Sequence, residues 1–415
     1  MIENQADDLV LTAADELDPG SASIGRNVDR VLSVVRAHLE MDVAFVSEFN
    51  GRERIFRNVV CGSESYVPIM PGDRAPLDEG YCLHVVEGRV PELIPDTAAI
   101  PVLAYIPETS LLPIGAHISV PIRLHDGSVY GTFCCFSAQP NMTLDQRDLQ
   151  MMRAFAELLG YQIEGELESV RAHEQKVERI SAVLEMGQPS IVYQPIYRIS
   201  DRKLVGVECL SRFHIEPWRP PNLWFDEAHE IGLGVRLELN AILTALDGLR
   251  GLPGDFHVAI NVSPDTIVTG GIAGYLYEWP AQRLVLEVTE HSHVDDYALL
   301  HERLQPLRAD GVRVAVDDAG AGYASMRHVL AMHPDIIKLD MSLTRGIDSD
   351  SPRRALAAAL IEFARQTGSK VVAEGVETAA ELNALKALGA DHVQGYYLSM
   401  PLDRNGLAAL ISRGP

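Results

Sequence analysis

From Ile191 to Tyr396 the sequence alternates short apolar runs with longer amphipathic segments, and this alternation limits the fold more than any other feature. The apolar runs are Ile191–Ile196, Leu204–Leu210, His257–Val262, Arg283–Val288, Val312–Val316, Asp335–Leu339, Lys370–Ala373 and His392–Tyr396. Short apolar runs that alternate with helical segments are typical of the strands of an α/β fold. Eight such runs in a region of this size predict a TIM-like (β/α)8 barrel rather than an open sheet.

A polar side chain closes nearly every one of these runs. These residues are Glu208, Asn261, Glu287, Asp317, Asp318, Lys338, Glu374 and Gln394. The carboxyl ends of the strands of a parallel barrel open on one face, so we expect one rim to bring together Glu208, Asn261, Glu287, Asp317, Asp318 and Glu374. Several carboxylates in a low-dielectric mouth can stay ionised together only if cations lie among them. Oxygen ligands favour Mg²⁺ or Mn²⁺, and a pair of such ions is a usual device for hydrolysing phosphate esters.

Each of these residues has a simpler explanation when it is taken alone. A single acidic residue after a strand is usually a helix cap or a solvated loop residue. Asp317 and Asp318 followed by Ala319–Gly322 fit an ordinary turn, and Lys338 fits a salt-bridge partner. The joint pattern favours a site, because the simpler explanations would have to hold independently at every strand.

The same residues lie in short motifs that follow one another along the chain. The motifs are Tyr193-Gln194-Pro195-Ile196, Glu208-Cys209-Leu210-Ser211-Arg212, Asn261-Val262-Ser263-Pro264, Glu287-Val288-Thr289-Glu290, Asp317–Met326, Ile337-Lys338-Leu339-Asp340, Ala373–Thr378, and Gln394-Gly395-Tyr396 with Pro401. In this order they resemble the EAL-domain phosphodiesterases of bacterial cyclic di-GMP signalling, over residues 188 to about 410. Cys209 replaces the alanine of the family signature, and it is expected to pack inside the barrel.

The resemblance implies metal ligands and catalytic residues. Glu208, Asn261, Glu287 and Asp317 would hold one Mg²⁺ or Mn²⁺ ion, and Asp317, Asp318 and Glu374 would hold a second ion and its water. Whether Glu374 is a ligand or the general base stays open. Lys338 would orient the attacking water or stabilise charge on the phosphoryl oxygens. Glu374, Lys338 and Asp318 are therefore the expected catalytic residues.

The resemblance also implies a substrate site. Arg212 would bind a phosphate of cyclic di-GMP, and the other expected substrate-binding residues are Gln194, Leu210, Glu377, Gln394 and Pro401. Glu290 would anchor the loop that begins at Asp317. The implied reaction is metal-dependent hydrolysis of cyclic di-GMP to the linear dinucleotide pGpG. A catalytically silent cyclic di-GMP receptor and a signalling scaffold are the alternatives, and the complete set of acidic ligands favours the enzyme.

The N-terminal region of the chain has a different pattern. Strand-like runs at Ala44–Phe49, Ile55–Val60, His117–Leu124 and Ser128–Ser137 follow a helical segment, and Thr143 with Gln146 predicts a capping box that opens a long closing helix. The stretches Gly80-Tyr81-Cys82, Ile114-Gly115-Ala116 and Tyr130-Gly131-Thr132 resemble a GAF domain, a small α+β sensor module. The resemblance leaves the ligand unknown.

The cysteines of this N-terminal region have two interpretations. Cys82 near His84 is compatible with attachment of a chromophore, but packing of a partly buried thiol is favoured. Cys134 and Cys135 are neighbours on one strand, so they are expected to point to opposite faces of a sheet.

These patterns divide the chain into four segments. They are a tail (1–24), a GAF-like sensor domain (25–165), a linker helix (166–187) and the EAL phosphodiesterase domain (188–415). Apolar residues at alternating three- and four-residue steps form a seam, namely Ile163, Leu167, Val170, Val177, Ile180 and Leu184. The seam indicates either a parallel coiled coil that joins two protomers of a homodimer and carries a signal, or one helix packing on its own domain. The sensor domain is expected to regulate the phosphodiesterase.

The overall composition restricts partners and location. The formal net charge of −23 argues against DNA or RNA polymers and anionic membranes as partners. No apolar run is long enough to predict a membrane span, and residues 1–8 do not resemble a signal peptide. An odd number of cysteines without a CxxC motif favours a reducing cytoplasm over a disulfide framework.

Overall fold

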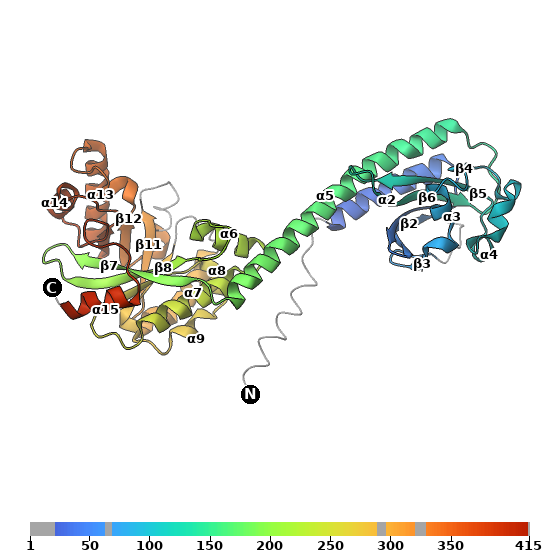
Figure 1. Ribbon diagram of the computed structural model, residues 1–415. Coiled ribbons are helices and arrows are strands. Elements are labelled where there is room, and N and C mark those ends of the chain that lie inside the picture. The colour runs from blue at the N-terminus through green and yellow to red at the C-terminus, as the bar shows by residue number, and fades with distance from the viewer. Residues whose placement is uncertain (1–20, 63–68, 289–295, 320–328, 414–415) are drawn as a thin grey trace. The chain divides into compact units, whose positions relative to one another are not determined.

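The computed structural model describes residues 21–62, 69–288, 296–319 and 329–413 (Figure 1). The chain divides into two compact units, residues 1–172 and 173–415, and each has its own sheet and its own hydrophobic core. The boundaries expected from the sequence for the tail, the sensor domain, the linker helix and the barrel domain stay predictions.

The first unit is built on one antiparallel sheet. Its strands are β1 (Val43–Asn50), β2 (Glu53–Cys61), β3 (Arg74–Pro76), β4 (Leu93–Ile94), β5 (Ala116–Arg123) and β6 (Val129–Ser137), arranged in the order β3-β2-β1-β6-β5-β4. Its helices are α2 (Ser21–His38), α3 (Tyr81–Val86), α4 (Glu108–Leu111) and the long α5 (Gln146–Glu185). The four strands expected from the sequence are confirmed, and the very short β3 and β4 were not predicted.

The two faces of this sheet carry separate hydrophobic cores. Cys135 packs with residues of α2 and α5 on one face, whereas Cys134 packs with Phe45 and Cys82 on the other. The expectation that the two neighbouring cysteines point to opposite faces is therefore confirmed.

Helix α5 begins with a different cap from the one expected. The Asp145 carboxylate accepts hydrogen bonds from the amides of Arg147 and Asp148, and the Asp148 carboxylate accepts one from the amide of Asp145. Thr143 instead donates its hydroxyl to Asn141. The predicted Thr143–Gln146 box is wrong, because the helix starts later and Asp145 takes the capping position.

The apolar seam of α5 is used differently along its length. Ile163 and Leu167 pack into the core of the first unit, and Ile180 and Leu184 pack beside Trp224 in the second. These contacts match the alternative in which the helix packs on its own domains. In the middle of the seam, Val170 is 46% exposed. The homodimer stays a prediction.

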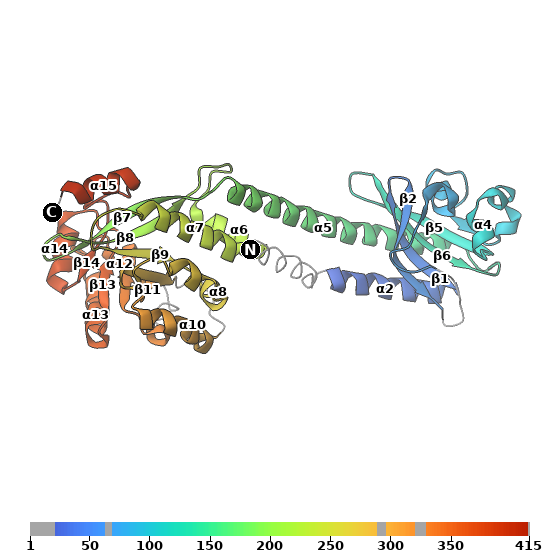
Figure 2. The same cartoon turned by 90° about the horizontal axis from the view of Figure 1, so that it is seen from below.

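The second unit is a closed eight-stranded barrel, as expected (Figure 2). Its strands are β7 (Ser190–Arg198), β8 (Leu204–Arg212), β9 (His257–Asn261), β10 (Leu284–Val288), β11 (Arg313–Ala319), β12 (Ile336–Leu339), β13 (Lys370–Ala373) and β14 (His392–Val393). The helices outside them are α6 (Pro221–Glu230), α7 (Gly234–Leu249), α8 (Pro264–Val268), α9 (Ile272–Leu276), α10 (Tyr297–Asp310), α12 (Met341–Thr344), α13 (Ser351–Thr367), α14 (Ala379–Leu388) and α15 (Arg404–Arg413).

One strand departs from the expected all-parallel arrangement. β7 runs antiparallel to both of its neighbours, β8 and β14, whereas the other adjacent pairs are parallel. A short turn near Arg202 joins β7 to β8 in place of a crossover helix, and a short connection of that kind forces an antiparallel pair.

The helices around the barrel start and stop at residues with a clear local reason. The Asp296 carboxylate caps α10, and the Asp350 carboxylate caps α13, each by accepting backbone N–H groups. Both helices end at glycines in the left-handed region, Gly311 at φ 104° and Gly368 at φ 79°.

The barrel interior is layered because side chains alternate along each strand. The middle layer is apolar and consists of Ile196, Ala259, Val285, Ala315, Ile336 and Val372. We call the barrel end at the carboxyl termini of the parallel strands the upper end, and the opposite end the lower end. Inward-pointing residues two positions from the middle layer form the upper and lower ends.

Candidate active site

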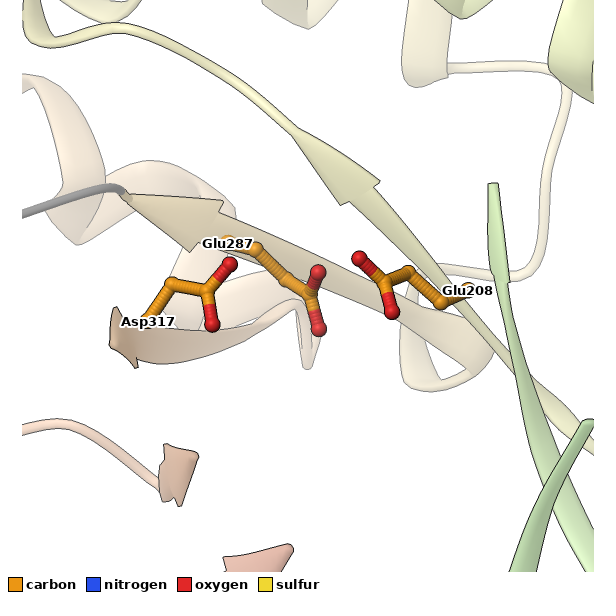
Figure 3. A group of neighbouring side chains, drawn as sticks. All are labelled: Glu208, Glu287 and Asp317. Atoms are coloured by element: carbon orange, nitrogen blue, oxygen red, sulfur yellow. The ribbon is translucent and has the colours of Figure 1, made fainter. Parts of the chain in front are cut away.

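The polar residues predicted from the sequence form the upper end of the barrel. Asn261, Glu287, Asp317, Lys338 and Glu374 each follow a middle-layer residue by two positions, on or just after β9 to β13. Glu208 lies on β8, and in Figure 3 its carboxylate points toward those of Glu287 and Asp317. The strand pattern therefore brings these side chains to one place.

Lys338 lies at the centre of the acidic residues. Its side chain is 1% exposed, and its Nζ lies 2.8 Å from Glu374 Oε1 and 2.9 Å from Glu287 Oε2. Asp317 Oδ1 is at 3.1 Å and Glu208 Oε1 at 3.3 Å. One ammonium thus contacts four carboxylates.

The electrostatics of the cluster show that one ammonium does not balance its negative charge. Burial raises the pKa of Glu287 well above its usual value, and the carboxylates of Glu208 and Asp317 raise it further against the effect of Lys338. Burial and the Asp317 carboxylate likewise raise the pKa of Glu374. Burial alone would lower the pKa of Lys338, yet the surrounding carboxylates raise it. The site therefore favours additional positive charge.

The arrangement of oxygen atoms fits divalent metal ions. Glu208, Glu287 and Asp317 each offer a carboxylate oxygen within 4.8 Å of the others, and Asp317, Asp318 and Glu374 form a second such group. Burial alone would raise the pKa of Glu208, but Lys338 and hydrogen bonds from Gln394 and Asn261 lower it, so it stays ionised. Buried carboxylates with an adjacent amide suit hard cations such as Mg²⁺ or Mn²⁺.

Asp318 is held in an uncommon backbone conformation. Its φ is 56°, in the left-handed region that non-glycine residues rarely adopt, and its amide donates to Asp317 Oδ1 at 2.9 Å. Strain of this kind is typical of functional sites, where the surrounding structure holds the residue in place. The conformation allows two successive residues of β11 to serve the same cluster.

The loop that carries Glu374 is supported by residues that were not predicted from the sequence. The Glu381 carboxylate accepts amides of Gly346 at 2.8 Å and of Glu377 and Thr378 at 2.9 Å, and the Thr344 hydroxyl donates to the carbonyl of Glu374. Thr378 and Glu381 form a capping box at the start of α14. The Thr-x-x-Glu spacing was the signal that could have identified Glu381.

Two glutamines of the expected substrate site lie beside the acidic cluster. Gln394 Nε2 donates to Gln194 Oε1 at 3.1 Å and also to the Glu208 carboxylate. Gln194 faces Glu208 across the β7–β8 pair. The structure therefore joins both glutamines to the metal-ligand candidates.

For the other expected substrate residues, the contacts described are with residues outside the acidic cluster. Leu210 and Arg212 lie two and four residues beyond Glu208 on β8, and the Arg212 guanidinium donates to the Ser211 carbonyl at 2.8 Å. Pro401 is half-buried. Glu377 forms an exposed ion pair with Arg345.

The remaining expectations concern Glu290 and the cysteines. Glu290 lies outside the described residues, as does most of the loop after Ala319. Cys209 is buried, but it packs with Ile242 and Leu246 of α7 outside the strands and not inside the barrel, because it alternates with the inward-pointing Glu208. Cys82 is 1% exposed and contacts Arg54, and Arg89 contacts the half-buried His84. This burial of Cys82 agrees with the packing interpretation.

Family comparisons point to the same two modules. The EAL domain model matches residues 177–401, and the GAF domain model matches residues 21–164. The chain is 30% identical over 220 residues to PdeD of Escherichia coli, a probable cyclic di-GMP phosphodiesterase, covering 50% of this chain and 41% of PdeD. It is 28% identical over 255 residues to another probable cyclic di-GMP phosphodiesterase of that organism, PdeG, covering 57% and 49%. The chain spans less than half the length of either relative.

Solved structures show the same fold. The phosphodiesterase PaMucR in complex with cyclic di-GMP is 28% identical, with a TM-score of 0.51, and the match covers 56% of this chain and 99% of that one. An EAL enzyme with cAMP and cyclic di-GMP bound matches 89% of this chain and 93% of its own, with a TM-score of 0.55 and 20% identity, which indicates likeness of fold alone. Within the described residues, no helix combines the length and apolar character needed to span a membrane.

Proposed function

Because the chain belongs to the EAL domain family, we propose that its barrel unit hydrolyses cyclic di-GMP to pGpG with two divalent ions, Mg²⁺ or Mn²⁺. The proposal rests on two clusters of three acidic residues at the upper end, which have Asp317 in common. In each cluster the three residues offer carboxylate oxygens that lie within 4.8 Å of one another. Glu208, Asn261, Glu287 and Asp317 would hold one ion, and Asp317, Asp318 and Glu374 the other. When bound, the ions supply Lewis acidity for the attacking water and the phosphodiester.

The side chains around the cluster suit the remaining steps of the reaction. Water attacks the phosphorus, the bond from phosphorus to the ribose 3′ oxygen breaks, and that oxygen takes up a proton from the solvent to leave as a hydroxyl. Glu374 receives the proton of the water, and Lys338, 2.8 Å from it, stabilises charge that develops on the phosphoryl oxygens. Gln194 and Gln394 orient the substrate beside Glu208, and the planar guanidinium of Arg212 suits its phosphate.

The rest of the chain is proposed to regulate this reaction. The GAF domain would bind a ligand of unassigned chemistry and change turnover through a homodimer, in which the exposed middle of α5 near Val170 forms the contact.

We also propose a cytoplasmic location. Its support is that all five cysteines are free thiols, although Cys82 Sγ and Cys134 Sγ lie only 3.3 Å apart.

The test is metal-dependent turnover of cyclic di-GMP by the purified chain. We expect pGpG to appear with Mg²⁺ or Mn²⁺, to disappear with chelator, and to be lost in Glu208→Gln. The matched control is Glu302→Gln, which removes an exposed carboxylate on α10 and should leave turnover unchanged. Binding of cyclic di-GMP without turnover, with metal present, would show a receptor instead of an enzyme.

A further inference from the structure

The lower end of the barrel holds a cavity of about 380 Å³ that is lined mainly by basic side chains. These residues are Arg198, Lys203, His257, Arg283, Arg313 and His392. Asp255 is the acidic residue of the lining. The cavity therefore concentrates positive charge in a chain whose formal net charge is −23.

The same alternation that builds the active site places these residues. His257 and Arg313 precede Asn261 and Asp317 by four positions on β9 and β11, so they point into the barrel from the other side of the apolar layer. Arg283 lies just before β10, four positions ahead of Glu287. At about 3.3 Å per strand residue, the two sets are roughly 13 Å apart along the strands. The cavity is consequently a separate feature from the acidic cluster.

The guanidinium groups of Arg283 and Arg313 are held in place before any ligand arrives. Arg283 Nε donates to the carbonyl of Phe256 at 3.0 Å, and its guanidinium stacks over the Phe256 and Trp279 rings at 4.9 and 5.6 Å. Arg313 Nη2 donates to the carbonyl of Gln282 at 3.3 Å. Side chains that are already ordered lose less conformational entropy on binding.

Two imidazoles, the buried one of His257 and the half-buried one of His392, complete the cavity wall. Their rings lie edge to face with centroids 6.2 Å apart, and within the described residues neither Nε2 of His257 nor Nδ1 of His392 has a hydrogen-bond partner. His257 is 9% exposed, and its ring occupies the space that a side chain at Gly206 would fill, since a Cβ there would lie 2.4 Å from Nε2. Each ring therefore keeps one nitrogen whose hydrogen-bonding capacity the described residues do not use.

Burial and the positive charges of the cavity change the pKa values of its titratable groups. Burial, together with the smaller effects of Arg313 and His392, lowers the pKa of His257 to about 3. Arg198 pairs with Asp201 at 3.0 Å, whereas burial lowers the pKa of Arg313 despite the attraction of Asp335. The positive charge at the cavity wall is thus only partly compensated by acidic residues.

We propose that this lower cavity binds a phosphate-bearing small anion. Guanidinium groups match the oxygens of a phosphate in charge and geometry, and the exposed Lys203 adds a point charge at the margin. The volume accommodates a phosphate that carries an organic group as well as the inorganic ion. The inference does not depend on the proposed hydrolysis of cyclic di-GMP.

The experiment is calorimetric titration of the full chain with inorganic phosphate and, separately, with GMP, in a buffer with chelator so that metal at the upper end plays no part. We expect saturable binding of at least one of the two anions, weakened about tenfold or more in Arg313→Gln and in Lys203→Gln. The matched control Lys386→Gln, which removes an exposed charge on α14, should bind like the unaltered chain. Tighter binding of GMP than of phosphate identifies an organic phosphate, and equal binding identifies the ion itself.

A second measurement keeps the proposal testable if Arg313→Gln does not fold. The imidazole nitrogen resonances of His257 should shift on saturation with the anion in the unaltered chain and in Lys386→Gln. No binding of either anion up to about 10 mM, binding that both basic-site variants retain, or His257 resonances that do not move would each overturn the proposal.

Discussion

The two ends of the barrel are formed by the same strands, yet they carry opposite charge. At the upper end buried carboxylates surround the single ammonium of Lys338, while at the lower end arginines surround two uncharged imidazoles, those of His257 and His392. An apolar layer that includes Val285 and Ile336 separates them. The comparison teaches that a closed barrel can hold two clusters of opposite charge, provided that an apolar layer keeps them apart.

The largest expected effect concerns the cation of the upper end. Replacing Lys338 with methionine keeps the length of the side chain but removes the charge that four carboxylates contact. We expect turnover of cyclic di-GMP to fall about 100- to 1,000-fold, because charge on the phosphoryl oxygens loses its stabilising group. Phosphate binding at the lower end should be unchanged. Lys386→Met is the matched control, and turnover within threefold of the unaltered chain would contradict the assigned role.

The second effect tests the uncharged state of the lower end by pH. The pKa of His257 is about 3 in the folded chain and about 6.5 when unfolded, so between these values the unfolded state binds the additional proton. Stability should therefore fall as pH decreases from about 6.5 toward 3, and at pH 4 this contribution is roughly 3 kcal/mol.

Chemical denaturation at pH 7 and pH 4 measures this contribution. His257→Gln cannot titrate, so it should lose less stability than the unaltered chain over that interval, whereas the exposed His173→Gln should behave like the unaltered chain. Equal losses in all three proteins would show that His257 is not held neutral.

The third effect separates positioning from chemistry at the upper end. Glu381 does not touch the acidic cluster, but its carboxylate orders the loop that carries Glu374. We expect Glu381→Gln to weaken Mn²⁺ affinity and turnover by about tenfold, with metal titrations as the direct measurement. The exposed Glu362→Gln is the control. A loss of stability with unaltered metal affinity would reduce Glu381 to a purely structural residue.

The smallest effect tests the apolar layer itself. Ile336→Val removes one methylene from the middle of the barrel and should lower the free energy of unfolding by about 1 kcal/mol. Neither turnover nor phosphate binding should change, because the layer serves only to separate the two ends. A change in either activity with no loss of stability would mean that the ends communicate through the barrel core.

Much of the upper end could be predicted because strand direction and side-chain alternation act on residues close in sequence. A polar residue after an apolar run, such as Glu287 or Glu374, must appear at the carboxyl end of its strand once the strands are parallel. The basic residues of the lower end stood at the first positions of three of the same runs, His257, Arg283 and His392. The alternation was thus sufficient to locate them, although the prediction rested on the residues that close the strands and not on those that open them.

Other features could not be predicted because they depend on contacts between distant segments. An apolar run such as that of β7 has the same pattern in either direction, so its antiparallel course follows only from the short turn to β8. The support of Glu374 by Thr344 joins the end of α12 to the loop that follows β13. The choice of Asp145 over Thr143 as the cap of α5 depended on where the helix begins, which local preference defines only to within a few residues.

The reversed direction of β7 has a mechanical consequence. In an all-parallel barrel the chain would enter at the lower end, but here Ser190 pairs with Arg212 at the upper end, immediately after α5. The last turns of α5 are clamped through Ile180 and Val183 against Trp224, beyond the carboxyl end of β8. A rotation or displacement of the end of α5 would therefore act on the upper end of the barrel near Gln194. It would not have to be transmitted along the full length of the strands.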